Sequence, residues 1–291
     1  HAIADATDAA LLGALAIAGR EEAERWGSER AHVTFVAMGR YGGRECSYAS
    51  DADVIALHEP VGGTSDSEAA ASATAIVNRV KKLLGSATSQ LGIVVDLDLR
   101  PEGKNGPMSR TIASHEEYAQ RWSSTWERQA AVRARPIGSS NLDERARALF
   151  ESMAYREVSE SEVRDIRLLK ARMENERLPR GSEPARHVKL GPGGLSDVEW
   201  TIQLIQMRHG ARLPALRTPS TTRAIAVARD AGLLAAPDAE ILLNAWDLAT
   251  RIRAGNTLAT GRMSGVKLDV LPRDSAELSA LAAILGYGSG G

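Results

Sequence analysis

Short apolar runs in the first third of the chain predict β-strands. Residues 33–38 and 54–57 are mostly apolar, and Gly, Ser and Asp residues separate the two runs. A third run, Leu91–Pro101, alternates so that Asp96 and Asp98 share one face of the expected strand. Together the three runs predict a small β-sheet.

Helical spacing surrounds these strands and then dominates the rest of the chain. An alanine-rich segment over about residues 4–25 and apolar positions over about 66–90 predict two early helices. Ser114 and Ser159 each stand three residues before a Glu, a spacing typical of a capped helix start, and the second of these helices is expected to run towards Arg177. Aliphatic faces predict four further helices, at 196–208, about 219–232, about 237–255 and 275–285.

The change from strand signals to helix signals falls near residue 150. We therefore expect an α+β chain with two domains: a small mixed sheet with flanking helices in residues 1–150, and an α-helical bundle in residues 151–291. Gly and Pro fall mainly between the expected helices of the second half, as short connections in a bundle require. A length of 291 residues also favours two domains over one.

The turn between the first two expected strands contains the residues with the clearest chemistry. Gly39, Gly42 and Gly43 allow the backbone to turn tightly and to approach an anionic ligand. Asp51 and Asp53 would face the same way on a strand, with Cα atoms about 6.5–7 Å apart. Two such carboxylates repel each other unless a cation lies between them, and Mg²⁺ takes one or two protein carboxylates together with water and substrate phosphates. The alternative is an ordinary solvated turn.

A third carboxylate strengthens the case for a metal site. Asp96 lies on the next expected strand, from which it could complete a two-metal centre that activates a hydroxyl and neutralises a leaving oxygen. The alternative is an edge strand with ordinary polar residues. The glycines fit neither the Gly-Lys-Ser/Thr ending of a Walker A loop nor the Gly-x-Gly-x-x-Gly of a Rossmann fold. The pattern therefore indicates metal-assisted chemistry on a nucleotide.

Composition narrows the class of protein. A formal net charge of −1 argues against a broad nucleic-acid surface, which needs a positive field. The single cysteine, Cys46, excludes an intrachain disulfide and is interpreted as a small packing residue rather than a nucleophile. No apolar run is expected to approach the length of a membrane span, and no signal peptide is visible. These features predict a cytoplasmic enzyme domain without a membrane or nucleic-acid partner, and the start at His1 indicates a fragment of a longer protein.

Two groups of large side chains allow both a structural and a binding interpretation. Arg128, Arg133 and Arg135 could line a nucleotide pocket, because guanidinium groups suit phosphate oxygens, but local salt bridges or solvent exposure are the more common role of such residues. Trp122 and Trp126 are four residues apart on one expected helix face. They are interpreted as packing between helices, with stacking on an adenine as the alternative.

Four ordered blocks of sequence resemble the glutamine synthetase adenylyltransferases, within the nucleotidyltransferase superfamily that includes DNA polymerase β. The blocks run from about residue 30 to the end of the chain and keep the family's order. Together they are a specific signal, whereas each block alone is weak. They are Met38–Glu45 with Ser50–Asp53, Val95–Gly103, Trp126–Ala130 with Arg133–Arg135, and Gly191–Trp200 with Gln203.

The chain departs from the family pattern at two places. Arg40 and Tyr41 stand where the family usually has Lys and Leu, so the charge is kept but its reach towards a phosphate changes. Asp98 stands where an Arg is common, which leaves Asp96 as the better third metal ligand and puts one phosphate contact in doubt.

The resemblance implies a polymerase β-like nucleotidyltransferase domain followed by a helical bundle domain. It implies that Asp51, Asp53 and Asp96 bind two Mg²⁺ ions, that ATP lies with its triphosphate over residues 39–43, and that Asp96 helps to take a proton from the attacking hydroxyl. The residues expected to contact the nucleotide are Gly39, Arg40, Gly42, Gly43, Ser50, Arg100, Lys104 and Lys189. Lys189 stands in a glycine-rich turn that could act as a lid or could simply precede an acidic helix start.

The implied reaction is transfer of AMP from ATP to a tyrosine hydroxyl of glutamine synthetase, with release of pyrophosphate, in the regulation of nitrogen assimilation. The PII signal protein is a further candidate partner. Two alternatives stay open: a related deadenylylating domain that removes AMP by phosphorolysis to give ADP, and a non-catalytic module that binds nucleotide or PII. The attaching domain is favoured because the helical half, Leu281–Tyr287 and Val132–Arg135 resemble the family's C-terminal copy.

Overall fold

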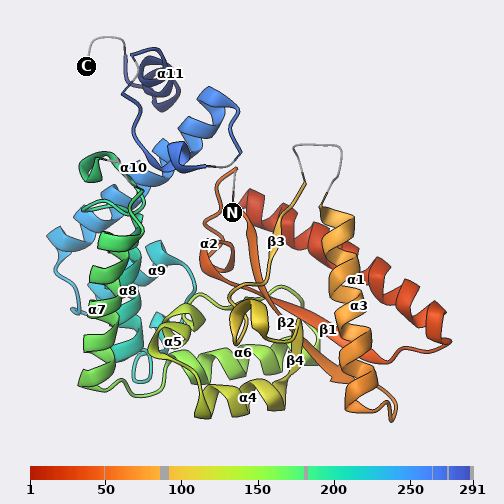
Figure 1. The fold of residues 1–291 in the computed structure, drawn as a ribbon. Helices are drawn as coiled ribbons and strands as arrows, with labels where there is room; N and C mark the ends of the chain where they lie inside the picture. Colours follow the sequence, from red (N-terminus) through yellow and green to blue (C-terminus); the bar gives the residue numbers. More distant parts are fainter. Residues whose placement is uncertain (49, 86–91, 180–182, 264, 274, 289–291) are drawn as a thin grey trace. The chain divides into compact units, whose positions relative to one another are not determined.

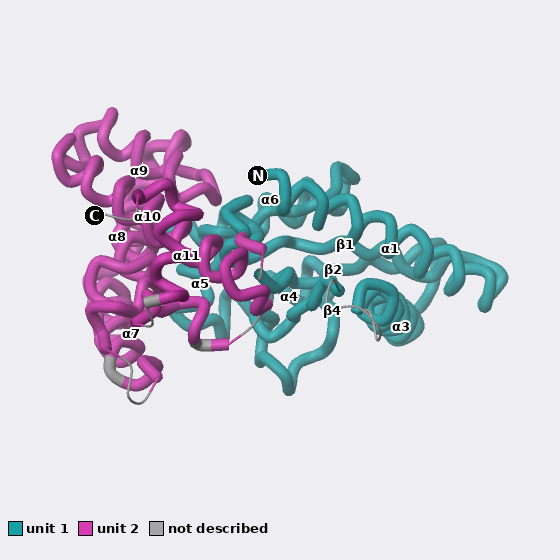
Figure 2. The backbone as a smooth tube through the Cα atoms, turned by 90° about the horizontal axis from the view of Figure 1, so that it is seen from above, with its two compact units in different colours: residues 1–46, 50–156 teal, residues 47–49, 157–291 magenta. Residues whose placement is uncertain are grey.

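The chain forms two compact units, which are shown in different colours in Figure 2. The computed structural model describes residues 1–48, 50–85, 92–179, 183–263, 265–273 and 275–288. The first unit comprises residues 1–46 and 50–156, and the second comprises residues 47–49 and 157–291. The first unit mixes helices with a small sheet and the second is mainly helical, so the prediction of an α+β chain is confirmed.

A mixed sheet runs through the first unit (Figure 1). In the described residues β1 lies between β2 and β5 and is antiparallel to both, whereas β3 and β4 pair in parallel with successive parts of β2. Residues 33–37 and 54–57 are in strands, as the apolar runs predicted. The strands are β1 (Ala31–Ala37), β2 (Ala52–Pro60), β3 (Val95–Asp96), β4 (Ser109–Thr111) and β5 (Arg135–Pro136).

Alternation along β1 and β2 buries both faces of the sheet. Phe35 and Val54 lie in a core with α1 (Ala2–Trp26) and α3 (Asp66–Leu84), two helices that lie side by side in Figure 1. The next residue along β1 towards the N-terminus, Thr34, points to the other face, where its hydroxyl donates a hydrogen bond to Asp143. Asp143 belongs to α6 (Asn141–Ala154), which packs against β1, β2 and β5.

Short polar motifs set the starts of several helices. Ser65 and Ser140 form capping boxes at the starts of α3 and α6, in which a hydroxyl and a carboxylate satisfy free backbone N–H groups. The predicted start at Ser114 is wrong by three residues: α4 spans Ile112–Arg121, and Thr111 is the capping residue that accepts a hydrogen bond from the Ser114 N–H at 3.1 Å. Thr111 ends β4, so the chain passes directly from strand to helix.

The interpretation of the two tryptophans as packing between helices is wrong. Trp122 is the residue that ends α4, and Trp126 lies in the next helix, α5 (Thr125–Ala131). Their side chains are 73% and 41% exposed, because the break between the helices removes the shared face that a continuous helix would give.

The third expected strand is much shorter than its alternating pattern predicted. β3 covers Val95–Asp96, and the chain then turns, with the Arg100 N–H donating to the Leu97 carbonyl at 3.0 Å. Leu91, the first residue of the expected strand, and the end of the helix expected over 66–90 lie outside the described residues.

The second unit contains the helices that the aliphatic spacing predicted. Ser159 forms the predicted capping box at the start of α7. Residues from α8, α9 and α10 share a core that includes Ile202, Ile225 and Trp246. The helices are α7 (Glu160–Glu176), α8 (Leu195–His209), α9 (Thr221–Asp230), α10 (Ala236–Thr260) and α11 (Ser275–Leu285), and short 3₁₀ helices lie at Gly103–Asn105 in the first unit and at Pro184–Arg186, Pro214–Leu216 and Val266–Asp269 in the second.

Helix α1 meets the length and composition criteria for a membrane span, alone among the described residues. An 18-residue window within it has a mean hydropathy of 1.5, so the prediction that no apolar run approaches that length is wrong. Core helices and signal sequences meet the same criteria. In this structure Leu11 and Ala14 of the helix are buried in the core of the first unit.

His115 is a buried titratable group of the first unit. Its ring packs edge-on against Phe150, and in the described part of the chain its Nδ1 has no hydrogen-bond partner. Burial, and then the charge of Arg110, lowers the pKa of His115 to about 4. The free imidazole titrates near 6.5, so the unfolded chain takes up the proton first as the pH falls.

The pH dependence of stability tests this burial. The contribution of a neutral His115 is complete above pH 6.5 and is lost as the pH falls from 6.5 towards 4, by up to about 3 kcal/mol. A His115→Phe variant removes the proton uptake, so its free energy of unfolding, measured in urea at several pH values, should fall less steeply over this window than that of the wild type. His32→Gln, which removes an exposed histidine from β1 of the same unit, is the control. Equal slopes for all three proteins would show that His115 is not buried in the neutral form.

Candidate active site

The glycine motif forms a single helical turn that begins directly after β1. This turn, α2, spans Gly39–Gly42, and the Gly42 N–H donates to the Met38 carbonyl at 2.7 Å. The N–H of Met38 donates to the carbonyl of Asp53 at 2.8 Å, which extends the pairing of β1 with β2 by one step. The turn therefore starts opposite Asp53.

Two of the glycines are required by the packing of the protein itself. Gly39 has a φ of +51°, and a methyl group at this position would lie 2.8 Å from Oδ2 of Asp53. A methyl group on Gly42 would lie 1.9 Å from the carbonyl oxygen of Arg133. Both glycines thus allow a close approach within the first unit, one to a carboxylate and one to a carbonyl.

The structure brings Asp53 and Asp96 together. They are register partners on the parallel strands β2 and β3, and neighbouring strands lie about 4.7–4.9 Å apart. Their neighbours Ala52 and Val95 are buried in the core with α1 and α3, so by alternation the two aspartates point to the opposite face. An Asp96 side-chain oxygen accepts a hydrogen bond from the Asp98 N–H at 2.6 Å, which fixes that side chain at the end of the short strand.

Asp51 is exposed and lies one residue before β2 begins. Across the described ranges, no three His, Cys, Asp or Glu side chains gather closely enough to form a ready metal site. The pair of Asp53 and Asp96 nevertheless has the donor set that suits Mg²⁺, which commonly takes one or two protein carboxylates and completes its shell with water and phosphate oxygens. The role of all three aspartates as metal ligands stays a prediction.

Charged groups of both signs surround Cys46, just beyond the turn. Burial raises the pKa of the Cys46 thiol to about 11, the positive charge of Arg40 opposes the rise, and the negative charge of Asp53 adds to it. The thiol is therefore protonated at neutral pH, which agrees with a packing role rather than a nucleophilic one.

The other residues predicted to contact the nucleotide have different surroundings. Arg100 is buried, and its guanidinium donates to the carbonyls of Leu97, Lys104 and Gly106 at 2.9–3.2 Å, so it holds the turn after β3. The Lys104 ammonium is exposed and lies 3.3 Å from Asp98. Ser50 is half-buried beside Asp51 and Gly43 is buried at the end of α2, whereas Lys189 is an exposed residue of the second unit. Nucleotide contacts by these residues remain predictions.

Arg133 and Arg135 hold the glycine turn from β5 and the residues before it. The Arg133 Nε donates to the Gly39 carbonyl at 3.0 Å and an Nη donates to Glu45 at 2.7 Å. The Arg135 Nε donates to the Gly42 carbonyl at 3.1 Å, and both of its Nη atoms bind Asp8 of α1 at 2.8 and 2.9 Å. These arginines therefore bind the protein's own backbone and carboxylates. The structural interpretation expected solvent exposure or local salt bridges, but these salt bridges are largely buried and join residues 88 and 127 positions apart.

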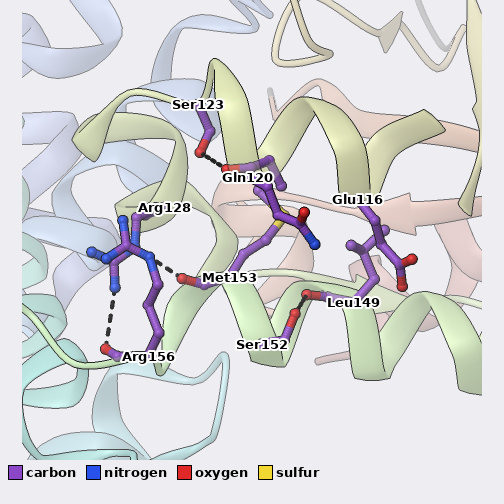
Figure 3. Close-up of a pocket in the computed structure, with 9 residues that line it drawn as sticks. Glu116, Gln120, Ser123, Arg128, Leu149, Ser152, Met153 and Arg156 are labelled. Atoms are coloured by element: carbon purple, nitrogen blue, oxygen red, sulfur yellow. Dashed lines mark hydrogen bonds between the residues drawn. The ribbon is translucent and has the colours of Figure 1, made fainter. Parts of the chain in front are cut away.

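Arg128 lines a separate pocket of about 350 Å³ between α4, α5 and α6, which Figure 3 shows in close-up. Its guanidinium donates to the carbonyls of Met153 at 3.0 Å and Arg156 at 3.2 Å. Apart from Arg128, no residue that was predicted to contact the nucleotide or the metal lines this pocket. The pocket is therefore distinct from the paired aspartates.

Sequence reasoning missed the residues that support the turn from outside it. Asp8 accepts a hydrogen bond from the Tyr41 hydroxyl at 2.6 Å as well as the two from Arg135. Burial, and then this hydrogen bond, raises the pKa of Tyr41. Asp8 lies in an alanine-rich helix and Glu45 follows the glycines without a periodic pattern. No local signal therefore marks Glu45 or Asp8 as the partner of an arginine that lies 88 or 127 positions away, respectively.

Comparison with known proteins gives the class to which this fold and site belong. Residues 1–150 match the family model described as glutamate-ammonia ligase adenylyltransferase, and residues 167–291 match the one described as GlnD PII-uridylyltransferase. The chain belongs to the glutamate-ammonia ligase adenylyltransferase family, whose curated members carry the name of a glutamine synthetase adenylyltransferase.

Curated relatives resemble the chain over nearly all of its length. Three relatives serve as examples, and each is named bifunctional glutamine synthetase adenylyltransferase/adenylyl-removing enzyme. The proteins from Streptomyces coelicolor and Streptomyces avermitilis are 45% and 47% identical over 99% of this chain, and that from Mycolicibacterium smegmatis is 42% identical over 89%. The chain covers 29%, 29% and 26% of these relatives, so it spans less than a third of their length.

A substitution at Gly42 tests the packing of the turn. Gly42→Ala would place a methyl group 1.9 Å from the Arg133 carbonyl oxygen, where neither backbone can move freely, and should lower the free energy of unfolding by about 1–3 kcal/mol or more. The matched control is Gly19→Ala in α1, where a methyl group meets nothing within 4 Å and should stabilise the helix by up to about 1 kcal/mol. Urea denaturation of both variants measures the difference. A Gly42→Ala protein as stable as the Gly19→Ala protein would contradict the close approach.

Proposed function

We propose that the first unit transfers AMP from ATP to a tyrosine hydroxyl of glutamine synthetase and releases pyrophosphate. The observation that carries this proposal is the meeting of the glycine turn with the paired aspartates: Gly39 contacts Asp53, and Asp53 is the register partner of Asp96. The family to which the chain belongs, and the names of its relatives, support adenylyl transfer involving glutamine synthetase. The finer description of this unit as a polymerase β-like nucleotidyltransferase domain, with a helical bundle domain after it, belongs to the same proposal.

The chemistry assigned to this chain's residues is positioning and charge. Asp53 and Asp96, with Asp51 beside them, would hold Mg²⁺, which when bound lowers the pKa of an attacking hydroxyl and neutralises charge on a leaving oxygen. The tyrosine oxygen forms a bond to the α-phosphorus as the bond from that phosphorus to the bridging oxygen breaks, so pyrophosphate departs. The tyrosine proton passes to a carboxylate, for which Asp96 is the candidate.

Cationic and backbone groups near the turn would bind the phosphates of ATP. Arg40 lies within the glycine turn itself. Its positive charge and the negative charge of Asp53 both act on the Cys46 thiol. Gly42, Gly43, Ser50 and Lys104 complete the expected contacts within the first unit, together with Arg100 if its turn rearranges. A nucleotide contact by Lys189 stays a prediction.

The reverse reaction is the main alternative. The relatives are named for both an adenylyltransferase and an adenylyl-removing activity, and the chain spans less than a third of their length, so it could carry either one. We favour the attaching activity because the helical half, Leu281–Tyr287 and Val132–Arg135 resemble the family's C-terminal copy.

In the second alternative, the chain binds nucleotide or PII without catalysis. The match of residues 167–291 to a family described as a PII-uridylyltransferase makes PII the candidate partner for this alternative. For the adenylyl-transferring activity that we favour, we also propose a cytoplasmic location.

Removal of the carboxylates tests the site. Asp51→Asn together with Asp53→Asn should reduce incorporation of AMP from labelled ATP into glutamine synthetase to less than about one hundredth of wild type, since loss of a charged group at a reacting centre commonly costs 10²–10³-fold. Circular dichroism should show an unchanged fold. The control, Asp66→Asn in the exposed first turn of α3, removes a carboxylate from the same unit and should keep the wild-type rate. A double variant that retains activity would overturn the assignment of these residues.

The direction of the reaction can be determined with two substrates. The chain is incubated with labelled ATP and unmodified glutamine synthetase, and separately with adenylylated glutamine synthetase and phosphate. We expect AMP incorporation in the first mixture and no ADP formation in the second. ADP formation in the second mixture alone would assign the adenylyl-removing activity to this chain, and no reaction in either mixture would favour the binding module.

A further inference from the structure

Arg133 lies beneath the glycine turn and is almost completely buried, with 3% of its side chain exposed. Its Nε donates to the carbonyl of Gly39 at 3.0 Å, and one of its Nη atoms donates to Glu45 at 2.7 Å. The side chain of Glu45 is 9% exposed, so the ion pair is shielded from water. One planar guanidinium therefore ties the first residue of the turn to a carboxylate just beyond its end.

The carbonyl that Arg133 holds belongs to the residue that touches Asp53. Gly39 adopts a φ of +51°, and its Cα hydrogen faces Asp53 so closely that a methyl group in its place would lie 2.8 Å from Oδ2. A movement of the Gly39 backbone would therefore change the space available to the Asp53 carboxylate. Arg133 reaches that carboxylate through Gly39 rather than by direct contact.

The backbone of Arg133 restrains the same turn at a second point. Its carbonyl oxygen occupies the space where a side chain at position 42 would begin, 1.9 Å from an ideal Cβ. The turn itself is closed by hydrogen bonds from Gly42 N–H to Met38 and from Glu45 N–H to Arg40, at 2.7 and 2.9 Å. Arg133 thus contacts both the beginning and the end of a turn that its own hydrogen bonds close.

We propose that Arg133 is a positioning residue that holds Gly39 against Asp53 and thereby sets the place of the Asp53 carboxylate for a divalent cation. This inference rests on the proposed function, because it assigns a purpose to the position of a predicted metal ligand. The geometry requires arginine, since two nitrogens of a rigid fork bind two acceptors in different directions. A lysine keeps the positive charge but has only one side-chain nitrogen. Arg133→Lys therefore tests the two-pronged geometry of the guanidinium while leaving the charge in place.

The chain offers a matched control in Arg128. It is also a buried arginine, 1% exposed, and its guanidinium also donates to two acceptors, which in this case are both backbone carbonyls, those of Met153 and Arg156. These acceptors lie in α6 and just after it, away from the glycine turn. Arg128→Lys therefore reproduces the cost of disturbing a buried guanidinium without touching Gly39.

The experiment measures binding of Mn²⁺, a spectroscopic substitute for Mg²⁺, by electron paramagnetic resonance in the presence of α,β-methylene-ATP, which cannot react. Arg133→Lys should weaken Mn²⁺ binding about 10–100-fold, the usual effect of losing a group that orients a metal ligand. Arg128→Lys should bind Mn²⁺ as tightly as the wild type, even if urea denaturation shows that the two variants have lost the same amount of stability. Equal Mn²⁺ affinities for the two variants would overturn the proposal.

Asp53→Asn separates this inference from the proposed function. If Asp53→Asn loses Mn²⁺ binding while Arg133→Lys retains it, the metal site stands and the positioning role fails. If Asp53→Asn binds Mn²⁺ as tightly as wild type, both fail. Should Arg133→Lys not fold, Glu45→Gln takes its place, because it removes the charged partner of the same guanidinium while keeping the shape of the side chain. Weakened Mn²⁺ binding in that variant supports the positioning role, and unchanged binding overturns it.

Discussion

The antiparallel pairing of β1 with β2 determines where every other part of the candidate site lies. The pairing continues past the end of β1, where the Met38 N–H donates to the Asp53 carbonyl, so the glycine turn must begin beside that aspartate. The other edge of β2 then receives β3, which places Asp96 next to Asp53. A shift of this register by one residue would turn Asp53 into the apolar core and Ala52 out of it. The apolar residues that fix the register therefore also fix the position of the acidic ones.

Buried charges support the turn that this pairing creates. Arg133 with Glu45, and Arg135 with Asp8, are ion pairs whose side chains are mostly shielded from water. Removing such charges from water costs several kcal/mol for each ion, and apolar residues of similar volume often replace a buried pair without loss of stability. We interpret the pairs as a source of geometric definition rather than of net stability, since each guanidinium also donates to a carbonyl of the turn.

Much of the fold could be predicted from local pattern, and the failures have local causes. The apolar runs of β1 and β2, the capping box at Ser159 and the helices of the second unit follow from periodicity and short-range hydrogen bonds, which the sequence contains. β3 is shorter than its alternation suggests because the buried Arg100 guanidinium pulls Leu97, Lys104 and Gly106 into a turn. The exposure of Trp122 depends on where α4 ends, and helix ends are set by contacts that spacing does not encode.

The candidate site divides in the same way. Asp53, Asp96 and the glycines could be found because residue type and alternation mark them, whereas their supports could not, because Asp8 and Glu45 meet their arginines only in the folded chain.

The pairing of Val36 with Pro136 also has a consequence for synthesis of the protein. The segment that restrains the glycine turn is the last part of the sheet to leave the ribosome, well after Asp53 and Asp96. Asp53 and Asp96 therefore leave the ribosome before the arginines that hold the turn. The final shape of the site forms only when these long-range contacts close the sheet, a slow class of folding event.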